Sequence, residues 1–396
     1  MKILVINNGS SSVKYKLFES DGWAVEVSGA LERIGEEKSR MTRRVLSPDG
    51  NEREEVKELR IGNHRAGMME MAGALSESGM RLGAIGHRVV HGGESFKRPA
   101  VIDRRVLEAI RKNVPLAPLH NPANLAGIET ALEIFPGVPQ VAVFDTAFHQ
   151  TIPERAFRYC IPKIFYIENG VRRYGFHGTS HQYVAGEAAA FLGREPSGAG
   201  LITIHLGNGA SMAAVKGGEC MDTSMGMTPL EGLCMGTRCG ELDPGVVFYM
   251  SGHLGMGLEE IDVLLNRESG LKGLCGVNDM REVLERRRGG DTDAALAVDI
   301  YTYRVRKYIG AYMAALGGAD ALVFTGGIGE KSPEIRALCC EGLDFLGIKI
   351  DSGANGTAGG TPAAIQAADS RVKILVIPTD EELEIARQTL GAAAGK

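Results

Sequence analysis

Four short stretches of the sequence place charged or imidazole side chains directly after predicted strands or within glycine-rich turns. Arg88 lies in GHRVVHGG, Asp145 follows the apolar run VAVF, His177 stands in YGFHGTSH and Arg238 in GTRCGELDPG. A guanidinium offers a planar fork to carboxylate or phosphate oxygens and stays charged at every working pH. One such residue is more often structural than catalytic, but four together predict a site that handles an anion.

Histidines accompany these residues, and two pairs have helical spacing. His87 and His91 are four residues apart, as are His177 and His181, while His149 follows Asp145 by four. Neither pair stands in an H-E-x-x-H motif, and the adjacent glycines disfavour a continuous helix. The sequence therefore does not favour a histidine-bound metal.

Two predicted hairpins have the composition of anion-binding turns. Residues 201–215 read as a strand, the turn HLGNG and a second strand, in which Asn208-Gly209 is expected to supply positive φ at a tight turn. Residues 2–18 repeat the pattern with NNGSSS. Such turns present successive backbone N–H groups that bind phosphate. Two of them predict a duplicated fold whose halves face each other across a phosphate.

A third glycine turn, residues 326–330 (GGIGE), follows the predicted strand 321–324 and precedes a helix. It matches neither G-x-G-x-x-G nor the P-loop, but together with the two hairpins it predicts a nucleotide site. Magnesium would then require carboxylate and amide oxygens. Asn7, Asp145 and Glu381 stand at predicted strand ends or near them and are the candidates.

The elements that must position these residues alternate between strand and helix in both halves. A boundary is expected near residues 148–155, and residues 351–370 read as a loop or weakly structured insertion. This alternation predicts an α/β protein with two sheet domains and a cleft between them. The main expected elements are the hairpin 42–55, strands 82–91, 138–144, 321–324 and 373–377, and helices 68–79, 105–112, 123–134, 293–317 and from 381 onward.

Composition excludes several classes of protein. A chain of 396 residues fits two domains, and no stretch approaches the roughly 18 apolar residues of a membrane span. The N-terminus lacks a signal-peptide pattern, so a cytoplasmic protein is expected. Seven cysteines without C-x-x-C argue against disulfides and zinc. A net charge of −5 offers no footprint for nucleic acid, and the basic run 286–288 is interpreted as the last turn of a helix.

Taken in order, NNGSSSVKYKL, GHRVVHGG, PLHNP, FDTAFH, YGFHGTSH, HLGNGAS, GTRCGELDPG and TGGIGE resemble the acetate kinase family over nearly the whole chain. The resemblance implies the duplicated actin-like, ribonuclease H-like fold with an interdomain cleft. It implies an N-terminal domain of residues 1–148 plus 382–396, and a C-terminal domain of residues 149–381 with nucleotide and dimer contacts. The implied activity is reversible phosphoryl transfer from ATP to acetate, giving ADP and acetyl phosphate, by a homodimer that requires Mg²⁺, with Mn²⁺ as an alternative.

The resemblance also implies roles for individual residues. Catalysis would involve Arg88, His120, Asp145, His177 and Arg238, and magnesium would be held by Asn7, Asp145 and Glu381. Acetate would contact Arg88 and an apolar pocket of Val90, Leu119, Phe176 and Pro229. The nucleotide would contact Ser10, Ser12, Lys14, His205, Leu206, Gly207, Asn208, Gly209, Asp279, Met280, Arg281, Gly326, Gly327, Ile328, Gly329 and Glu330.

The implied chemistry needs cations more than a base. Acetate is already ionised at pH 7, because its pKa is about 4. Two like charges about 4 Å apart repel by roughly 4 kcal/mol at an effective dielectric of 20, so bringing acetate to a γ-phosphate requires several positive charges. Asp145 is therefore expected to act through the metal.

Two positions depart from the family pattern. Asp380 stands where the family commonly has asparagine and adds a carboxylate beside Glu381, which would alter magnesium affinity; Lys331 also replaces an asparagine and reads as a surface change. Among alternatives, a propionate kinase differs chiefly in pocket size. A nucleotide switch of actin or chaperone type has no use for Arg88 and Arg238, and a sugar kinase would need polar residues at Val90 and Phe176.

Overall fold

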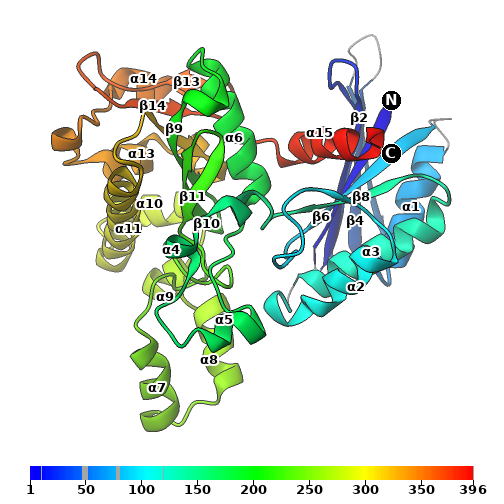
Figure 1. Cartoon of the computed structure of the whole chain (residues 1–396), viewed down its shortest axis with the longest axis horizontal. Coiled ribbons are helices and arrows are strands. Elements are labelled where there is room, and N and C mark those ends of the chain that lie inside the picture. Colours follow the sequence, from blue (N-terminus) through cyan, green and yellow to red (C-terminus); the bar gives the residue numbers. More distant parts are fainter. Residues whose placement is uncertain (10, 47–51, 77–80, 119, 396) are drawn as a thin grey trace. The chain divides into compact units, whose positions relative to one another are not determined.

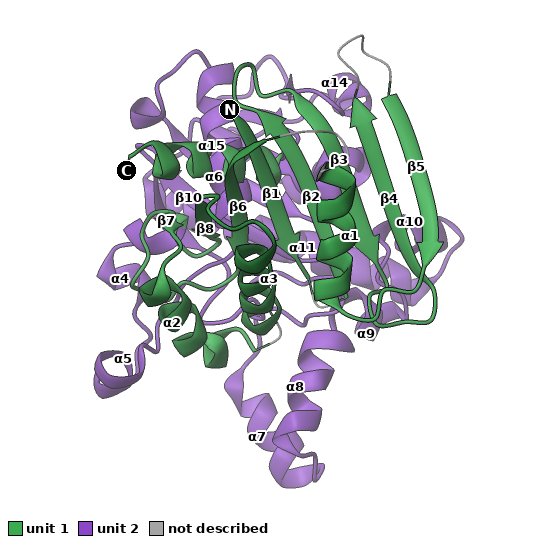
Figure 2. Cartoon of the chain, turned by 90° about the vertical axis from the view of Figure 1, so that its right-hand side faces the viewer, with its two compact units in different colours: residues 1–148, 380–396 green, residues 149–379 purple. Residues whose placement is uncertain are grey.

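The computed structural model describes residues 1–9, 11–46, 52–76, 81–118 and 120–395. The chain divides into two compact units, which Figure 2 colours separately. Unit 1 consists of Met1–Phe148 and Asp380–Lys396, and unit 2 of His149–Thr379. Among the described residues, no helix is both long enough and apolar enough to cross a membrane.

Unit 1 is built on a mixed sheet with the strand order β5-β4-β3-β2-β1-β6-β8-β7. Strands β1, β6 and β8 are parallel, and the others pair in antiparallel fashion. The strands are β1 (Lys2–Asn8), β2 (Ser12–Glu19), β3 (Val25–Glu32), β4 (Ser39–Leu46), β5 (Glu52–Leu59), β6 (Leu82–Val89), β7 (Ala100–Val101) and β8 (Gln140–Phe144). The helices are α1 (His64–Ser76), α2 (Arg104–Lys112), α3 (Asn121–Ile134) and α15 (Glu381–Ala394).

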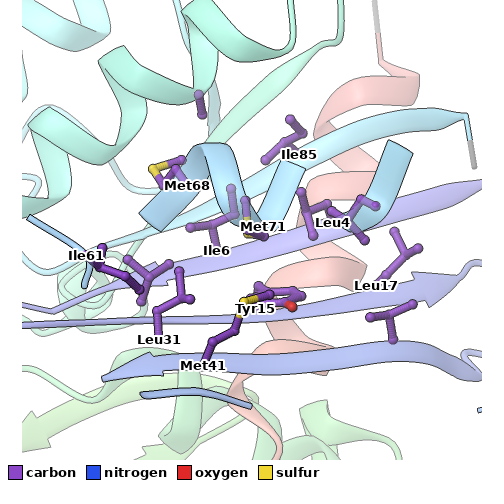
Figure 3. Packing of buried hydrophobic residues seen from close by; sticks show 14 of the residues in the cluster. Leu4, Ile6, Tyr15, Leu17, Leu31, Met41, Ile61, Met68, Met71 and Ile85 are labelled. Carbon is purple, nitrogen blue, oxygen red and sulfur yellow. The ribbon is translucent and has the colours of Figure 1, made fainter. Parts of the chain in front are cut away.

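Helices bury both faces of this sheet. Because successive strand residues point to opposite faces, Leu4 and Ile6 of β1 pack toward α1, whose Met68 and Met71 join the same cluster (Figure 3). Ile3 and Val5 face the other way and join a cluster with Ile385 and Ala386 of α15. A strand buried on both faces reads as a continuous apolar run, which is why the first residues are ILVI.

Unit 2 repeats the arrangement with the order β11-β10-β9-β12-β14-β13. Here β9, β12 and β14 are parallel and correspond to β1, β6 and β8, while β10 and β11 correspond to β2 and β3. The shared order confirms the predicted duplication. The strands are β9 (Gly200–Leu206), β10 (Ala210–Lys216), β11 (Glu219–Thr223), β12 (Ala321–Thr325), β13 (Ala363–Ala364) and β14 (Lys373–Val376).

Most helices of unit 2 are labelled in Figure 1. The predicted long helix is α11, which begins after the N-cap Asp291 and ends at Gly317 with φ 73°. The α-helices of unit 2 are α4 (Glu154–Phe157), α5 (Ile164–Asn169), α6 (Gly178–Phe191), α7 (Pro244–His253), α8 (Leu258–Arg267), α9 (Gly270–Cys275), α10 (Met280–Arg288), α11 (Thr292–Leu316), α12 (Gly326–Lys331), α13 (Pro333–Cys340) and α14 (Ser352–Thr357).

The chain crosses once from unit 1 to unit 2 and once back, and each crossing follows a parallel strand. After β8, the last long strand of unit 1, it enters unit 2, where α6 packs against β9 and β12. After β14, the corresponding strand of unit 2, it returns to unit 1, where α15 packs against β6 and β8. Each sheet is thus covered by a helix that follows a strand of the other sheet.

Of two local predictions, one is wrong and one is confirmed. The prediction of a loop over residues 351–370 is wrong, because α14 and β13 lie there; the Asp351 side chain accepts the Ala354 N–H at 2.8 Å and starts the helix. The hairpin over 42–55 is confirmed as β4 and β5, although its turn lies outside the described residues.

Candidate functional site

In unit 1, the sheet brings three predicted site residues to one edge. Asn7 is near the end of β1, Arg88 near the end of β6, and Asp145 directly follows β8, with its N–H donating to Val89 O at 2.9 Å. Parallel neighbours end at the same edge of a sheet, which is where α/β proteins place their ligands.

Arg88 and Asp145 form a close ion pair at this edge. Arg88 Nη2 lies 2.6 Å from Asp145 Oδ2, and its Nε donates to both carboxylate oxygens at 3.1 Å. Burial alone would lower the pKa of Arg88, but the charges of Asp145 and Glu381 raise it above its usual value. The guanidinium is therefore a fixed positive charge in contact with a carboxylate that is 1% exposed.

Glu381, the first residue of α15, adds a second carboxylate 3.9 Å from Arg88 Nε. Burial raises the pKa of Glu381 to about 6, with Asp145 and Glu382 adding to the rise and Arg88 opposing it. Buried Asp145 and half-buried Glu381 against one guanidinium leave an excess of negative charge. Hard oxygen donors with that excess fit a divalent cation such as Mg²⁺.

Asp380 has a structural role next to these carboxylates. Its Oδ1 accepts the Leu383 N–H at 3.0 Å as the N-cap of α15, and it lies 3.2 Å from Lys16 Nζ. Lys16 also lies 3.3 Å from Glu382. The additional carboxylate thus caps the helix that carries Glu381 and is paired with a lysine.

The other predicted residues of unit 1 are spread around the same strands. Exposed Lys14 on β2 pairs in register with Asn7, and Ser12 opens β2, where its carbonyl accepts the Gly9 N–H at 2.8 Å. His120 directly precedes α3. Ser10 and Leu119 lie outside the described residues.

Val90 and His91 are buried just after β6 and are held by α3. The Val90 N–H donates to Asn124 Oδ1 at 3.1 Å, and the His91 N–H donates to Asn121 Oδ1 at 3.1 Å. His91 Nδ1 accepts the Gly93 N–H, and burial lowers the pKa of His91 to about 4. His91 is therefore a neutral residue that shapes this turn.

In unit 2, the turn between β9 and β10 differs from the predicted tight hairpin. The prediction of positive φ at Asn208-Gly209 is wrong, because neither residue has a left-handed backbone conformation. The turn is three residues long, the Gly207 N–H donates to Gly209 O at 3.0 Å, and Asn208 O accepts the Gly236 N–H at 2.9 Å. A Cβ at Gly236 would lie 1.9 Å from Asn208 Oδ1, so the GTRCG loop must pass this turn with a glycine.

His177 is fixed by a chain of polar side chains that leads away from this turn. Its Nδ1 is 2.8 Å from Ser211 Oγ, which is 2.8 Å from His181 Nε2, and His181 Nδ1 is 2.7 Å from Thr203 Oγ1. His177 itself has φ 57° and directly precedes α6, and its ring stacks on His205 at 4.6 Å between centroids.

This chain determines which nitrogen of His177 carries a proton. Thr203 donates onward to Ala213 O, so His181 Nδ1 donates to Thr203 and its Nε2 accepts from Ser211. Burial lowers the pKa of His181 well below its usual value, which keeps His181 neutral. Ser211 then accepts from His177 Nδ1, so Nε2 is the nitrogen of His177 that accepts when the ring is neutral and donates when the ring is protonated.

Arg238 lies at the same place as His177 and the glycine turn. A Cβ at Gly209 would lie 3.4 Å from His177 Nε2 and 3.6 Å from Arg238 Nη1. Arg238 Nη1 donates to Pro229 O at 3.3 Å and approaches Met235 Sδ at 3.8 Å, but among the described residues no carboxylate pairs with it. Burial lowers the pKa of Arg238. An unneutralised guanidinium beside a backbone turn is a site for an anion.

Phe176, the predicted neighbour of the acetate methyl, is buried beside these residues. It is 2% exposed, and its carbonyl lies 2.9 Å from His149 Nε2. The other ring nitrogen of His149 lies 3.1 Å from Cys220 Sγ. His149 thus supports the backbone just before His177.

A cavity of 580 Å³ in unit 2 gathers much of the predicted nucleotide site. It lies beside the Gly207–Asn208 turn and is bounded by α10, α12 and the start of α13. Its lining residues are Gly207, Asn208, Asp279, Met280, Arg281, Leu284, Arg288, Gly327, Ile328, Lys331, Ser332, Pro333 and Glu334.

The glycine turn 326–330 forms α12 at the end of β12. Gly326 has φ 77°, and a Cβ there would lie 2.8 Å from Leu206 O, so only glycine fits. Glu330 Oε1 accepts the N–H of Gly326 at 2.9 Å and that of Thr379 at 3.1 Å. Gly327 and Ile328 face the cavity, while Glu330 fixes the turn.

Sequence reasoning missed part of the cavity wall. Leu284 follows Arg281 by three residues and Arg288 follows Leu284 by four, which is the pattern of one helix face, so the sequence contained this signal. Arg288, interpreted as a helix-end cation, lines the cavity and pairs with Glu334 at 2.8 Å. Lys331 is exposed, as expected for a surface change, and it also lines the cavity.

Duplicated sheets, carboxylates at one strand edge and a glycine-lined cavity are the features of an α/β kinase. The Acetokinase family model matches residues 2–387, and the chain belongs to this family. It is 54% identical to an acetate kinase of Syntrophobacter fumaroxidans, over 98% of this chain and 96% of the relative.

Solved structures agree with this assignment. The acetate kinase of Porphyromonas gingivalis superposes with a TM-score of 0.92 at 43% identity, covering 99% of each chain. A propionate kinase of Francisella tularensis gives a TM-score of 0.93 at 43% identity, covering 98% of this chain and 99% of its own.

Proposed function

We propose that the chain is a magnesium-dependent acetate kinase that transfers the γ-phosphoryl group of ATP reversibly and directly to acetate. The observation that carries the proposal is Arg238, a guanidinium without a carboxylate partner in the described part of the chain, which shares one space with His177 Nε2 and Gly209. Phosphoryl transfer asks a protein mainly to position reactants and to stabilise charge. The Arg238 guanidinium, the His177 ring and the Gly209 backbone N–H would supply the positive charge or the hydrogen-bond donors for this stabilisation.

The nucleotide would occupy the 580 Å³ cavity of unit 2. Its volume lies within the range of roughly 300–1,000 Å³ for small-molecule sites. The Gly207–Asn208 turn at one side would meet the phosphates, and Ile328 and Leu284 offer apolar surface to the base.

Asp145 and Glu381, with Asn7 on the neighbouring strand, would hold Mg²⁺, or Mn²⁺ in its place. The metal would supply charge neutralisation for the phosphate oxygens. Arg88 orients Asp145 through three hydrogen bonds, and it would bind the acetate carboxylate. Acetate, with a pKa of about 4, needs no general base. Ser12, Lys14 and His120 are proposed as supporting residues.

We also propose a cytoplasmic homodimer. Unit 2 exposes a group of large apolar side chains on α7, at the residue that follows it and at the start of α8, which supports association with a second copy. These are Phe248, Tyr249, Leu254 and Leu258.

A coupled assay of ADP release tests the activity. It compares acetate, propionate, butyrate and glycerol at equal ATP, with and without Mg²⁺. We expect the highest kcat/KM with acetate, weaker use of propionate and none of glycerol. Use of glycerol alone would overturn the proposal, and equal kcat/KM for the two shorter acids would favour a propionate kinase, a reading that the Francisella tularensis structure keeps open.

Val90→Ala should change the ratio of the kcat/KM values for acetate and propionate. Val90 is 7% exposed and, as a β-branched residue, stiff at χ1, so it is proposed to crowd the extra carbon of propionate. One methylene is worth about 1–3 kcal/mol in an apolar pocket. We expect KM for propionate to fall and KM for acetate to rise. An unchanged ratio of the two kcat/KM values would remove Val90 from the pocket.

Gly327→Leu should obstruct the nucleotide. No atom lies within 4 Å of a Cβ at Gly327, so the fold tolerates the side chain, but the residue faces the cavity. We expect KM for ATP to rise by about tenfold, equivalent to about 1.4 kcal/mol, with KM for acetate unchanged. Gly186→Leu on α6, where a Cβ is equally unobstructed, is the matched control. Equal ATP affinity in both variants would place the nucleotide elsewhere.

A further inference from the structure

Arg336 on α13 is a charged side chain with no contact to solvent. It is 0% exposed and is the bulkiest of the fully buried side chains that the structure describes. Within the described ranges no carboxylate pairs with it. Burying a guanidinium without a counter-ion is costly, so its environment must supply many hydrogen bonds.

Carbonyl groups and one asparagine supply those bonds. Arg336 Nη1 donates to the carbonyls of Gly329 at 2.9 Å and Glu330 at 2.8 Å. Its Nε donates to Asn355 Oδ1 at 2.8 Å, and its Nη2 to Asn355 O at 2.7 Å. Asn355 in turn donates from Nδ2 to Pro333 O at 2.8 Å. Four of the five guanidinium N–H groups thus have partners.

These bonds join three short helices into one wall. Gly329 and Glu330 belong to the last turn of α12, whose carbonyls have no partners within the helix, and a cation at that end is favourable. Asn355 belongs to α14, and Pro333 opens α13. Helices of six or eight residues do not hold their shape alone, so these cross-links determine where they lie.

The wall that they form is the side of the nucleotide cavity made by α12 and α13. Gly327, Ile328 and Lys331 come from α12, and Ser332, Pro333 and Glu334 follow directly. Arg336 and Asn355 do not line the cavity themselves. Their hydrogen bonds end on Gly329 and Glu330, which lie between lining residues in the sequence, and on Pro333, which lines the cavity itself.

We infer that Arg336 and Asn355 are positioning residues for the nucleotide, which set the affinity for ATP and ADP by holding this wall in place. The inference rests on the proposed function, because it takes the cavity as the nucleotide site. Losing the hydrogen bonds of Arg336 and Asn355, which we call the clamp, should weaken nucleotide binding. Acetate binding and the transfer step should not change, because Arg88, His177 and Arg238 have no contact with the clamp among the described residues.

The test compares Arg336→Lys and Asn355→Ala with the wild type. Lysine keeps the charge but cannot reach four acceptors with one ammonium, and Asn355→Ala removes two of the bonds while retaining Arg336. We expect KM for ATP and the Kd of ADP, measured by calorimetry, to rise at least tenfold, with kcat and KM for acetate within about threefold. Val184→Ala, which removes buried volume from α6, is the control for general destabilisation.

The outcomes separate this inference from the proposed function. If the wild type binds no ADP, the result contradicts the proposed function itself. If the wild type binds ADP and both variants keep its Kd within twofold, or if all kinetic constants change together as in Val184→Ala, the clamp is structural only and the inference is overturned. Should Arg336→Lys fail to fold, Asn355→Ala carries the same test.

Discussion

Arg238→Ala is expected to lower kcat at least 100-fold. The side chain supplies an unpaired positive charge next to His177 Nε2 and the Gly209 backbone. Loss of one preorganised donor to a transition state typically costs about 100- to 1,000-fold, or roughly 2.7–4 kcal/mol. Because the guanidinium has no ion pair with any residue that the structure describes, its removal should change the folded state little. The measurement is kcat at saturating ATP and acetate.

Two variants serve as controls for this result. Arg194→Ala removes an arginine of the same unit that is 48% exposed and paired with Asp320, and it should retain full activity. Arg238→Lys should recover part of the rate, because the charge remains but the planar fork is lost. A folded Arg238→Ala enzyme with kcat near that of the wild type would exclude this arginine from the mechanism.

Arg88→Ala should cause a loss of similar size, about 100-fold or more, but by a different route. Its removal leaves Asp145, which is 1% exposed, and Glu381 without their shared counter-charge. An unpaired buried carboxylate is strongly destabilising, so both a lower kcat and a lower melting temperature are expected.

ADP binding separates the two consequences of Arg88→Ala. The nucleotide cavity belongs entirely to unit 2, whereas Arg88 belongs to unit 1. The Kd of ADP measured without Mg²⁺ should therefore stay unchanged in a folded variant. Arg104→Ala, at an arginine whose side chain is 91% exposed, is the matched control in unit 1. Retention of more than a third of wild-type kcat in Arg88→Ala would contradict the assigned role.

Local patterns in the sequence were sufficient for the strands and for the residues at their ends. Asn7, Arg88 and Asp145 each end or follow an apolar run, and three parallel strands bring such residues to one edge without further information. The duplication was visible because both hairpins repeat the same arrangement of strand, glycine turn and strand.

Residues that act through distant partners could not be found in this way. Ser211 and Thr203 matter only because β10 and β9 place them on either side of His181, and no spacing reveals that arrangement. The geometry of the Asn208 turn was mispredicted for the same reason, since the loop that contains Gly236 supports it from outside. Arg336 resembles any helix arginine until its four acceptors are known.

The reciprocal crossing of the chain has a consequence for the order in which the protein is completed on the ribosome. Residues 149–379 of unit 2 are contiguous and can fold as soon as they emerge. The strands of unit 1 are made before unit 2, yet Ile3 and Val5 lack the part of their cover that Ile385 and Ala386 supply until α15 is made after unit 2. Domains usually finish in the order of synthesis, N-terminal first. Here the unit whose strands are made first is completed second, and the sheet face of Ile3 and Val5 lacks its covering helix while the whole of unit 2 is made.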